Sequence, residues 1–109
     1  MATSKPDQLY GILDMLVLKV LDQGPKHGYA IAVHLDQLSS AVLQVEEGSL
    51  YPALYRMEQR GWITSAWGVT ENNRRARYYK LTRSGRRQLE LETESWSRVT
   101  AAVQSVLSS

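Results

Sequence analysis

Seven of the chain's thirteen Lys and Arg residues fall within residues 72–87, a stretch that contains no Asp or Glu. A basic run without acidic neighbours creates a local positive field that attracts phosphate groups. Such a run can equally be a solvated surface, which is the commoner role of charged segments. The members that we expect to contact phosphate are Arg74, Arg75 and Arg77.

A second chemical pattern lies in residues 49–60. Leu50, Leu54 and Met57 recur at spacings of four and three, which predicts a helix held on a core by these three side chains. Polar and aromatic side chains then remain for the surface, where hydroxyls can bond phosphates or base edges and rings can contact thymine methyls. The expected contact residues of this helix are Ser49, Tyr51, Pro52, Tyr55 and Arg56.

Each of these assignments has a structural alternative. Tyr51 or Tyr55 can be a half-buried packing residue. Arg56 has no acidic residue three or four positions away, so an ion pair within its own helix is not expected. We expect Ser49 to cap the helix, which would place Pro52 in the first turn, where proline is tolerated.

Apolar periodicity predicts two further helices before this one. Residues 9–21 carry a wide apolar stripe, and residues 28–38 follow a Gly-Pro break. Lys26 and His27 stand at the start of this second helix, and we include them in the expected DNA-binding set. The segment 39–48 connects the second and third helices.

The rhythm then changes from helix to strand. Residues 62–69 alternate between two faces, "ARYYKL" is a partner strand, and the polar segment 70–74 is the turn between them. Thr82 is a suitable cap for a last helix of about residues 83–106. The chain is therefore expected to be mostly α-helical with a two-stranded β-hairpin.

This order of elements is typical of a winged helix-turn-helix, in which the third helix enters the major groove of DNA. We divide the chain into a flexible N-terminus (1–8), a DNA-binding domain (9–81) and a C-terminal dimerisation helix (82–109).

The last helix carries an apolar seam at heptad spacing, interrupted by Glu92. Such a seam packs on another helix, and we expect that helix to be a second copy. The alternative is that the helix folds back on its own core. The expected dimer residues are Leu89, Trp96, Val99, Val103 and Val106.

Composition limits the remaining function classes. The 109 residues suffice for one domain, which is marginal alone and would gain stability from dimerisation. The absence of cysteine excludes disulfides and thiolate metal sites and suits the cytoplasm, while His27 and His34 alone do not form a metal cluster. The sequence contains no run of apolar residues long enough to cross a membrane, and the N-terminus has no apolar signal core.

No pattern typical of an enzyme is present, because the sequence has no phosphate-binding glycine loop and no nucleophile motif. We therefore expect no catalytic residues, no metal and no cofactor. A winged helix used only for protein interaction stays open as an alternative, and the salt dependence of DNA binding distinguishes the two.

Four stretches together resemble one known family. They are "HGYAI", "GSLYPALYRMEQRGWI", "RRARYYKLTRSGRRQL" and "ESWSRV", and in this order they are similar to the PadR family of bacterial transcriptional regulators. The resemblance implies a homodimeric winged-helix regulator, usually a repressor, that binds a palindromic operator in double-stranded DNA. The single short C-terminal helix resembles the smaller subfamily and, within it, a multidrug-responsive member.

That likeness also implies a ligand site. In the multidrug-responsive member, tryptophans of the two last helices stack on flat aromatic effectors at the dimer interface, and Trp96 matches them. The neighbouring wall would be formed by Asp14, Met15, Val99 and Thr100. Thr100 stands where that member has a carboxylate, so the preference for cationic ligands need not carry over. Alternatively, Trp96 only fills the dimer core.

Overall fold

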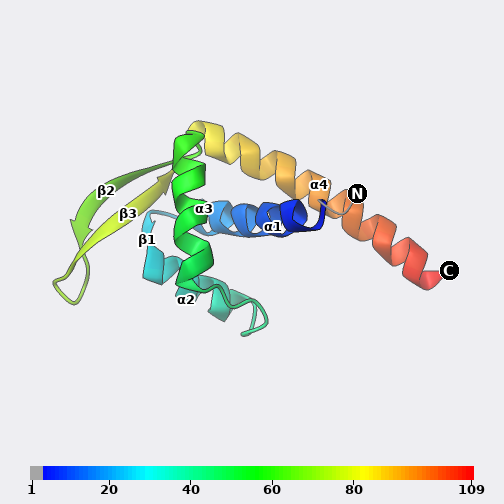
Figure 1. Cartoon of the computed structure of the whole chain (residues 1–109), viewed down its shortest axis with the longest axis horizontal. Helices are drawn as coiled ribbons and strands as arrows, with labels where there is room; N and C mark the ends of the chain where they lie inside the picture. Colours follow the sequence, from blue (N-terminus) through cyan, green and yellow to red (C-terminus); the bar gives the residue numbers. More distant parts are fainter. Residues whose placement is uncertain (1–3) are drawn as a thin grey trace.

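Three helices, a β-hairpin and a long fourth helix follow one another along the chain, and a short strand lies between the first two helices (Figure 1). The computed structural model describes residues 4–109, with side chains described from residue 12 onward. The order confirms the predicted winged helix-turn-helix with a C-terminal helix. The elements are α1 (Ser4–Leu21), β1 (Lys26–His27), α2 (Gly28–Leu38), α3 (Glu47–Gln59), β2 (Ile63–Val69), β3 (Arg75–Leu81) and α4 (Arg83–Ser108).

The core lies where α1, α2 and α3 meet the sheet and the beginning of α4. Leu50, Leu54 and Met57 are fully buried, which confirms the stripe predicted for α3. They pack with Val17, Leu18 and Ile31 among other apolar side chains. Burying this stripe fixes which face of α3 remains in solvent.

Two helices begin earlier than predicted. α1 begins at Ser4, so part of the expected flexible N-terminus is helical, while residues 1–3 lie outside the described residues. α3 begins at Glu47 and has Glu46 as its N-cap residue, without a side-chain cap. The prediction of Ser49 as the cap is therefore wrong. An acidic residue in the first turn is favoured by the helix dipole, so Glu47 supports the earlier start.

The earlier start moves Pro52 beyond the first turn. Pro52 is the sixth residue of α3, where its missing N–H removes the bond that an amide would make to the carbonyl of Gly48. The helix continues to Gln59, because its buried leucines and Met57 hold it on the core.

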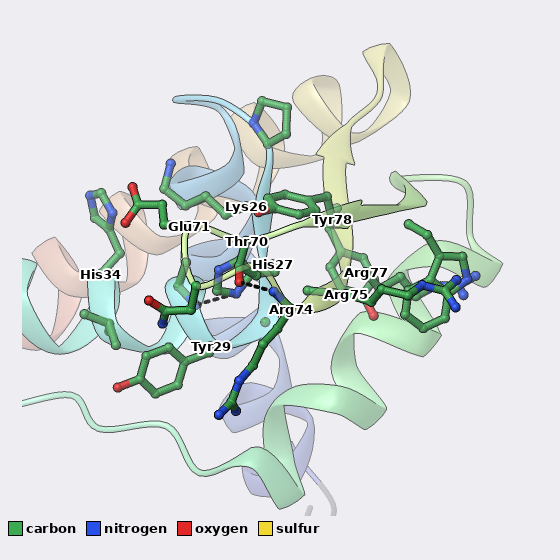
Figure 2. Close-up of a pocket in the computed structure, with 18 of the residues that line it drawn as sticks. Lys26, His27, Tyr29, His34, Thr70, Glu71, Arg74, Arg75, Arg77 and Tyr78 are labelled. Carbon is green, nitrogen blue, oxygen red and sulfur yellow. Dashed lines mark hydrogen bonds between the residues drawn. The ribbon is translucent and has the colours of Figure 1, made fainter.

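The sheet has a third strand that the sequence did not predict. β2 and β3 form the expected antiparallel hairpin, and β1 adds to the other edge of β3, giving the order β1-β3-β2. A strand of two residues is too short to show periodicity. The turn between β2 and β3 is closed by hydrogen bonds between Thr70 and Arg74, one of them from the Arg74 amide to Thr70 Oγ1 at 3.3 Å (Figure 2).

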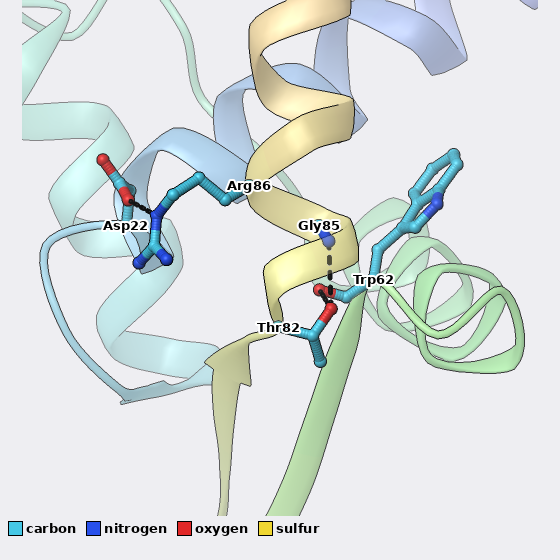
Figure 3. A network of polar contacts seen from close by, with 5 residues as sticks. All are labelled: Asp22, Trp62, Thr82, Gly85 and Arg86. Atoms are coloured by element: carbon cyan, nitrogen blue, oxygen red, sulfur yellow. Dashed lines mark hydrogen bonds and ion pairs between the residues drawn. The ribbon is translucent and has the colours of Figure 1, made fainter.

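Thr82 caps α4 as predicted. Its Oγ1 accepts from the Gly85 amide at 2.9 Å and lies 3.0 Å from the Trp62 carbonyl oxygen (Figure 3). It also donates to the Gly61 carbonyl oxygen at 2.7 Å. A Cβ on Gly85 would overlap the Trp62 carbonyl oxygen, so only glycine fits this close approach. On the other side, Arg86 pairs with Asp22 at 3.2 Å and ties α4 to the end of α1. The start of α4 is therefore fixed on the domain.

Beyond its first turns, α4 extends away from the domain (Figure 1). Leu89, which we expected at a dimer interface, is buried in the protomer's own core. That expectation is corrected, because the first part of the seam packs on its own chain. The later apolar positions, from Trp96 to Val106, are exposed. Within residues 4–109, no helix has the length and apolarity needed to cross a membrane.

Candidate nucleic-acid interface

The solvent face of α3 carries the polar and aromatic residues that the sequence singled out. Ser49, Tyr51, Pro52 and Tyr55 are all exposed, on the side away from the buried leucines. This face offers hydroxyl groups, two rings and a proline surface. Such a mixture suits the edges of base pairs in a groove.

Tyr51 has a defined position on this face. A Cβ on buried Gly28 would lie 2.5 Å from the Tyr51 hydroxyl oxygen, so the ring packs directly on the start of α2. Tyr51 is therefore a packing residue on one side, while 43% of the residue remains exposed.

Arg56 does not share this exposed face. Its Nη2 donates to Asp14 Oδ1 at 2.7 Å, and the side chains are 28% and 5% exposed. The sequence pattern indicates only partners within the same helix, whereas this carboxylate lies in α1, 42 positions away. Burial raises the pKa of Asp14, and the charge and hydrogen bond of Arg56 oppose that rise. Arg56 and Asp14 thus join α3 to α1.

The hairpin formed by β2, β3 and the turn between them is the wing of this fold. It carries the basic residues predicted for phosphate contact, and Arg74, Arg75 and Arg77 are all exposed. The ion pairs formed by side chains from residue 12 onward involve Arg56, Arg86 and Arg98, not these three. Within that part of the chain, no carboxylate forms a salt bridge that neutralises the wing arginines. Their charge is therefore available to a phosphate.

An open groove of about 1190 Å³ lies between the wing and the beginning of α2 (Figure 2). Lys26, Arg74 and Arg77 are among the basic side chains that line it. His27, also on its wall, accepts from the Ala30 amide through Nδ1 at 3.3 Å and packs edge-on against Tyr78. His27 thus caps α2, while Lys26 brings positive charge to the groove.

The residues expected around an aromatic ligand are only partly brought together in one protomer. Trp96, Val99 and Thr100 are exposed on α4, whereas Met15 packs at the edge of the core. Asp14 is buried and paired with Arg56, so it is not an open charge on a ligand wall.

Glu92, which interrupts the apolar seam of α4, has a polar environment that the sequence did not predict. It is half-buried one turn before Trp96, and its Oε1 is covered and has no hydrogen-bond partner among the described residues. Gln88 Nε2 donates to its Oε2 at 2.8 Å. Burial is the main cause that raises the pKa of Glu92, and the nearby Asp14 raises it further.

The wing also contains polar and aromatic residues that the sequence did not predict for this site. Trp67 lies beside the guanidinium groups of Arg75 and Arg77, and Ser65 joins Arg77 to Glu58 of α3. The strand alternation already placed Ser65 and Trp67 on one face. The alternation does not specify the register of β2 against β3, and this register sets Trp67 opposite Arg77.

The basic side chains of the groove and of the hairpin give this surface a positive charge that suits an anion. Burial is the first cause of the raised pKa values of Asp14, Tyr79 and Glu92, and of these three only Tyr79 lines the basic groove. Among the described side chains, no three His, Asp or Glu residues come close enough to hold a metal ion.

Comparison with known proteins agrees with this geometry. The family of PadR-like transcriptional regulators matches residues 17–91. A PadR-like transcriptional regulator from Bacillus cereus is 29% identical, with a TM-score of 0.79 over 94% of this chain and 98% of its own. A PadR family regulator from Eggerthella lenta is 30% identical, with a TM-score of 0.74 over 97% and 91%. A transcriptional regulator from Clostridium thermocellum is 27% identical, with a TM-score of 0.82 over 91% and 96%.

Proposed function

This chain belongs to the PadR-like family of transcriptional regulators, which are DNA-binding proteins and not enzymes, and we propose that it is a homodimeric repressor of the smaller PadR subfamily. The observation that carries the proposal is the exposed face of α3 beside a wing whose arginines lack carboxylate partners among the described side chains. A regulator of transcription acts where the chromosome is, so we assign the protein to the cytoplasm.

In this proposal α3 enters the major groove and the wing contacts the adjacent backbone. The exposed hydroxyls and rings of α3 read base edges, and the basic side chains hold phosphates. Arg56 is omitted, because its bond to Asp14 supports α3 from behind. The proposed contacts are Ser49, Tyr51, Pro52 and Tyr55 in the major groove, and Lys26, Arg74, Arg75 and Arg77 on the backbone; His27 caps α2 beside Lys26.

The dimer is proposed from α4. Trp96, Val99, Val103 and Val106 are spaced by three and four residues and are exposed along a helix that extends from the domain. Apolar side chains at this spacing pack against a matching helix, and a second copy supplies one. A two-fold dimer presents two copies of α3, which explains why the operator would be palindromic.

The same interface is the proposed site for an effector. Trp96, 45% exposed, offers a flat surface to a planar aromatic molecule. Asp14 is excluded as the charged group of this site, because it is already paired.

A reporter gene behind the upstream region of the protein's own gene tests this function. We expect expression to fall when the protein is present and to recover when a flat aromatic compound is added. Native mass spectrometry of the complex should give two protomers per duplex. Unchanged expression, or one protomer per duplex, contradicts the repressor and the dimer respectively.

A further inference from the structure

Two arginines of the wing converge on one aromatic ring. The guanidinium carbon of Arg75 lies 4.8 Å from the centre of the Trp67 ring, and that of Arg77 lies 5.5 Å from it. The register sets Trp67 opposite Arg77, and alternation along β3 keeps Arg75 on the same face. These three residues, called the Trp67 cluster, form one surface unit, in which Trp67 is 60% exposed.

A chain of hydrogen bonds joins this cluster to α3. Arg77 Nε donates to Ser65 Oγ at 2.8 Å, and Ser65 Oγ donates to Glu58 Oε2 at 2.6 Å. The Ser65 hydroxyl uses its acceptor for the arginine and its donor for the carboxylate. Because Glu58 belongs to α3, the position of Arg77 is set relative to the helix that faces the groove.

Two like charges on one ring repel each other, and the negative face of the ring offsets this repulsion. The contact also limits the rotamers of two long side chains that would otherwise lose that freedom on binding. Arg75 and Arg77 make no salt bridge among the described residues, so their remaining N–H groups face solvent. A pre-ordered pair of guanidinium groups suits an oxyanion such as a backbone phosphate.

We propose that Trp67 is a positioning residue: it holds Arg75 and Arg77 together for the DNA backbone, and Ser65 and Glu58 fix that pair relative to α3. The inference rests on the proposed DNA-binding function and deepens it. Trp67 acts through the arginines and makes no base contact of its own.

Fluorescence anisotropy of the full-length protein on its operator, titrated over a range of salt, tests the role. Trp67→Leu keeps bulk and apolarity but removes the aromatic face. We expect it to weaken binding about 5- to 20-fold, from the loss of two exposed cation–π contacts. Trp67→Phe should restore most of the affinity. Val69→Ala is the matched control, since Val69 is 61% exposed on the same face of the same strand, and it should leave affinity unchanged.

A double-mutant cycle separates positioning from direct contact. In a protein that carries both Arg75→Ala and Arg77→Ala, adding Trp67→Leu should weaken binding no further. The two arginine substitutions themselves should reduce the salt slope by about 0.9 per lost phosphate contact. An equal loss in both backgrounds overturns the inference, as does a Trp67→Phe protein as weak as Trp67→Leu. Ser65→Ala, which leaves the ring in place, should weaken binding by a smaller factor, and an unchanged affinity overturns the link to α3.

The same titration distinguishes failure of this inference from failure of the function. Wild-type protein that binds its operator while Trp67→Leu binds equally well refutes only the role of Trp67. Wild-type protein that binds no duplex at low salt refutes DNA binding itself and the inference with it.

Discussion

The guanidinium group of Arg56 donates a 2.7 Å hydrogen bond to Asp14, which joins α3 to α1 across 42 positions of the chain. Asp14 in turn lies close enough to Glu92 of α4 for its charge to raise the pKa of that carboxyl. The Arg56–Asp14 bond therefore ties the helix proposed to read DNA to the first helix of the core.

Replacing Arg56 with leucine should destabilise the fold. Asp14 would remain buried without its ion-pair partner, which should lower the free energy of unfolding by about 3 kcal/mol. This is near the lower end for buried ion pairs, because the Arg56 side chain is 28% exposed. Urea unfolding measures the change. Arg98→Leu is the control: it breaks an ion pair with Glu94 whose side chains are 70% and 69% exposed, and it should change stability by less than about 0.5 kcal/mol. An Arg56→Leu protein of normal stability but weakened DNA binding contradicts the supporting role and restores Arg56 as a DNA contact.

Glu92 should make stability depend on pH. Folded Glu92 holds its proton more tightly than unfolded Glu92, so its contribution is greatest below the ordinary glutamate pKa of about 4.3 and is lost as the pH rises through the raised pKa. The Glu92→Gln protein should be more stable than wild type at pH 7, and its stability should decrease less as the pH rises. Thermal unfolding between pH 4 and 8 measures it. Glu90 is exposed on the same helix, so Glu90→Gln is the control and should keep the wild-type dependence of unfolding temperature on pH. If Glu92→Gln shows the same dependence as Glu90→Gln, the prediction is contradicted.

Tyr51 and Gly28 should act as one unit in DNA binding. Gly28→Ala adds a methyl group 2.5 Å from the Tyr51 hydroxyl oxygen and must displace that ring. We expect weaker binding to the operator with an unchanged salt slope. Tyr51→Ala alone should cost about 1–3 kcal/mol, mainly on the specific site. The double variant should bind as Tyr51→Ala does, and additive losses in anisotropy titrations would show that Gly28 acts by another route.

Val103→Asp should separate the dimer into folded monomers. Val103 is half-exposed in one protomer, and a charge there would face the apolar seam of a second copy. Sedimentation velocity reports the change in mass. Val42→Asp, in the connector between α2 and α3, is the control at a more exposed valine and should remain dimeric. A dimeric Val103→Asp protein contradicts the proposed interface.

The sequence predicted the elements whose signals are local. The spacing of Leu50, Leu54 and Met57 located the buried face of α3, and Thr82 marked the start of α4. It failed where the partner is distant: Asp14 for Arg56, and the sheet edge of β3 for β1. Leu89 belongs to the predicted seam, yet its position in the core depends on how α4 meets α1, which no local pattern specifies.

The interface was predicted in part for the same reason. Exposed Tyr51, Tyr55 and the wing arginines follow from composition and helical phase. The positions of Arg75 and Arg77 on Trp67 depend on the register of β2 and β3, which the sequence left undetermined.

The most direct test is fluorescence anisotropy of the wild-type protein on labelled DNA from the upstream region of its own gene. A random duplex of equal length is measured beside it at two salt concentrations. Sequence reading by α3 with phosphate contacts from the wing predicts binding about a thousand-fold tighter to the upstream duplex, and affinity for both duplexes that falls as salt rises. Equal affinity for the two duplexes would contradict a repressor of its own gene, and no binding to either would leave a protein-interaction module.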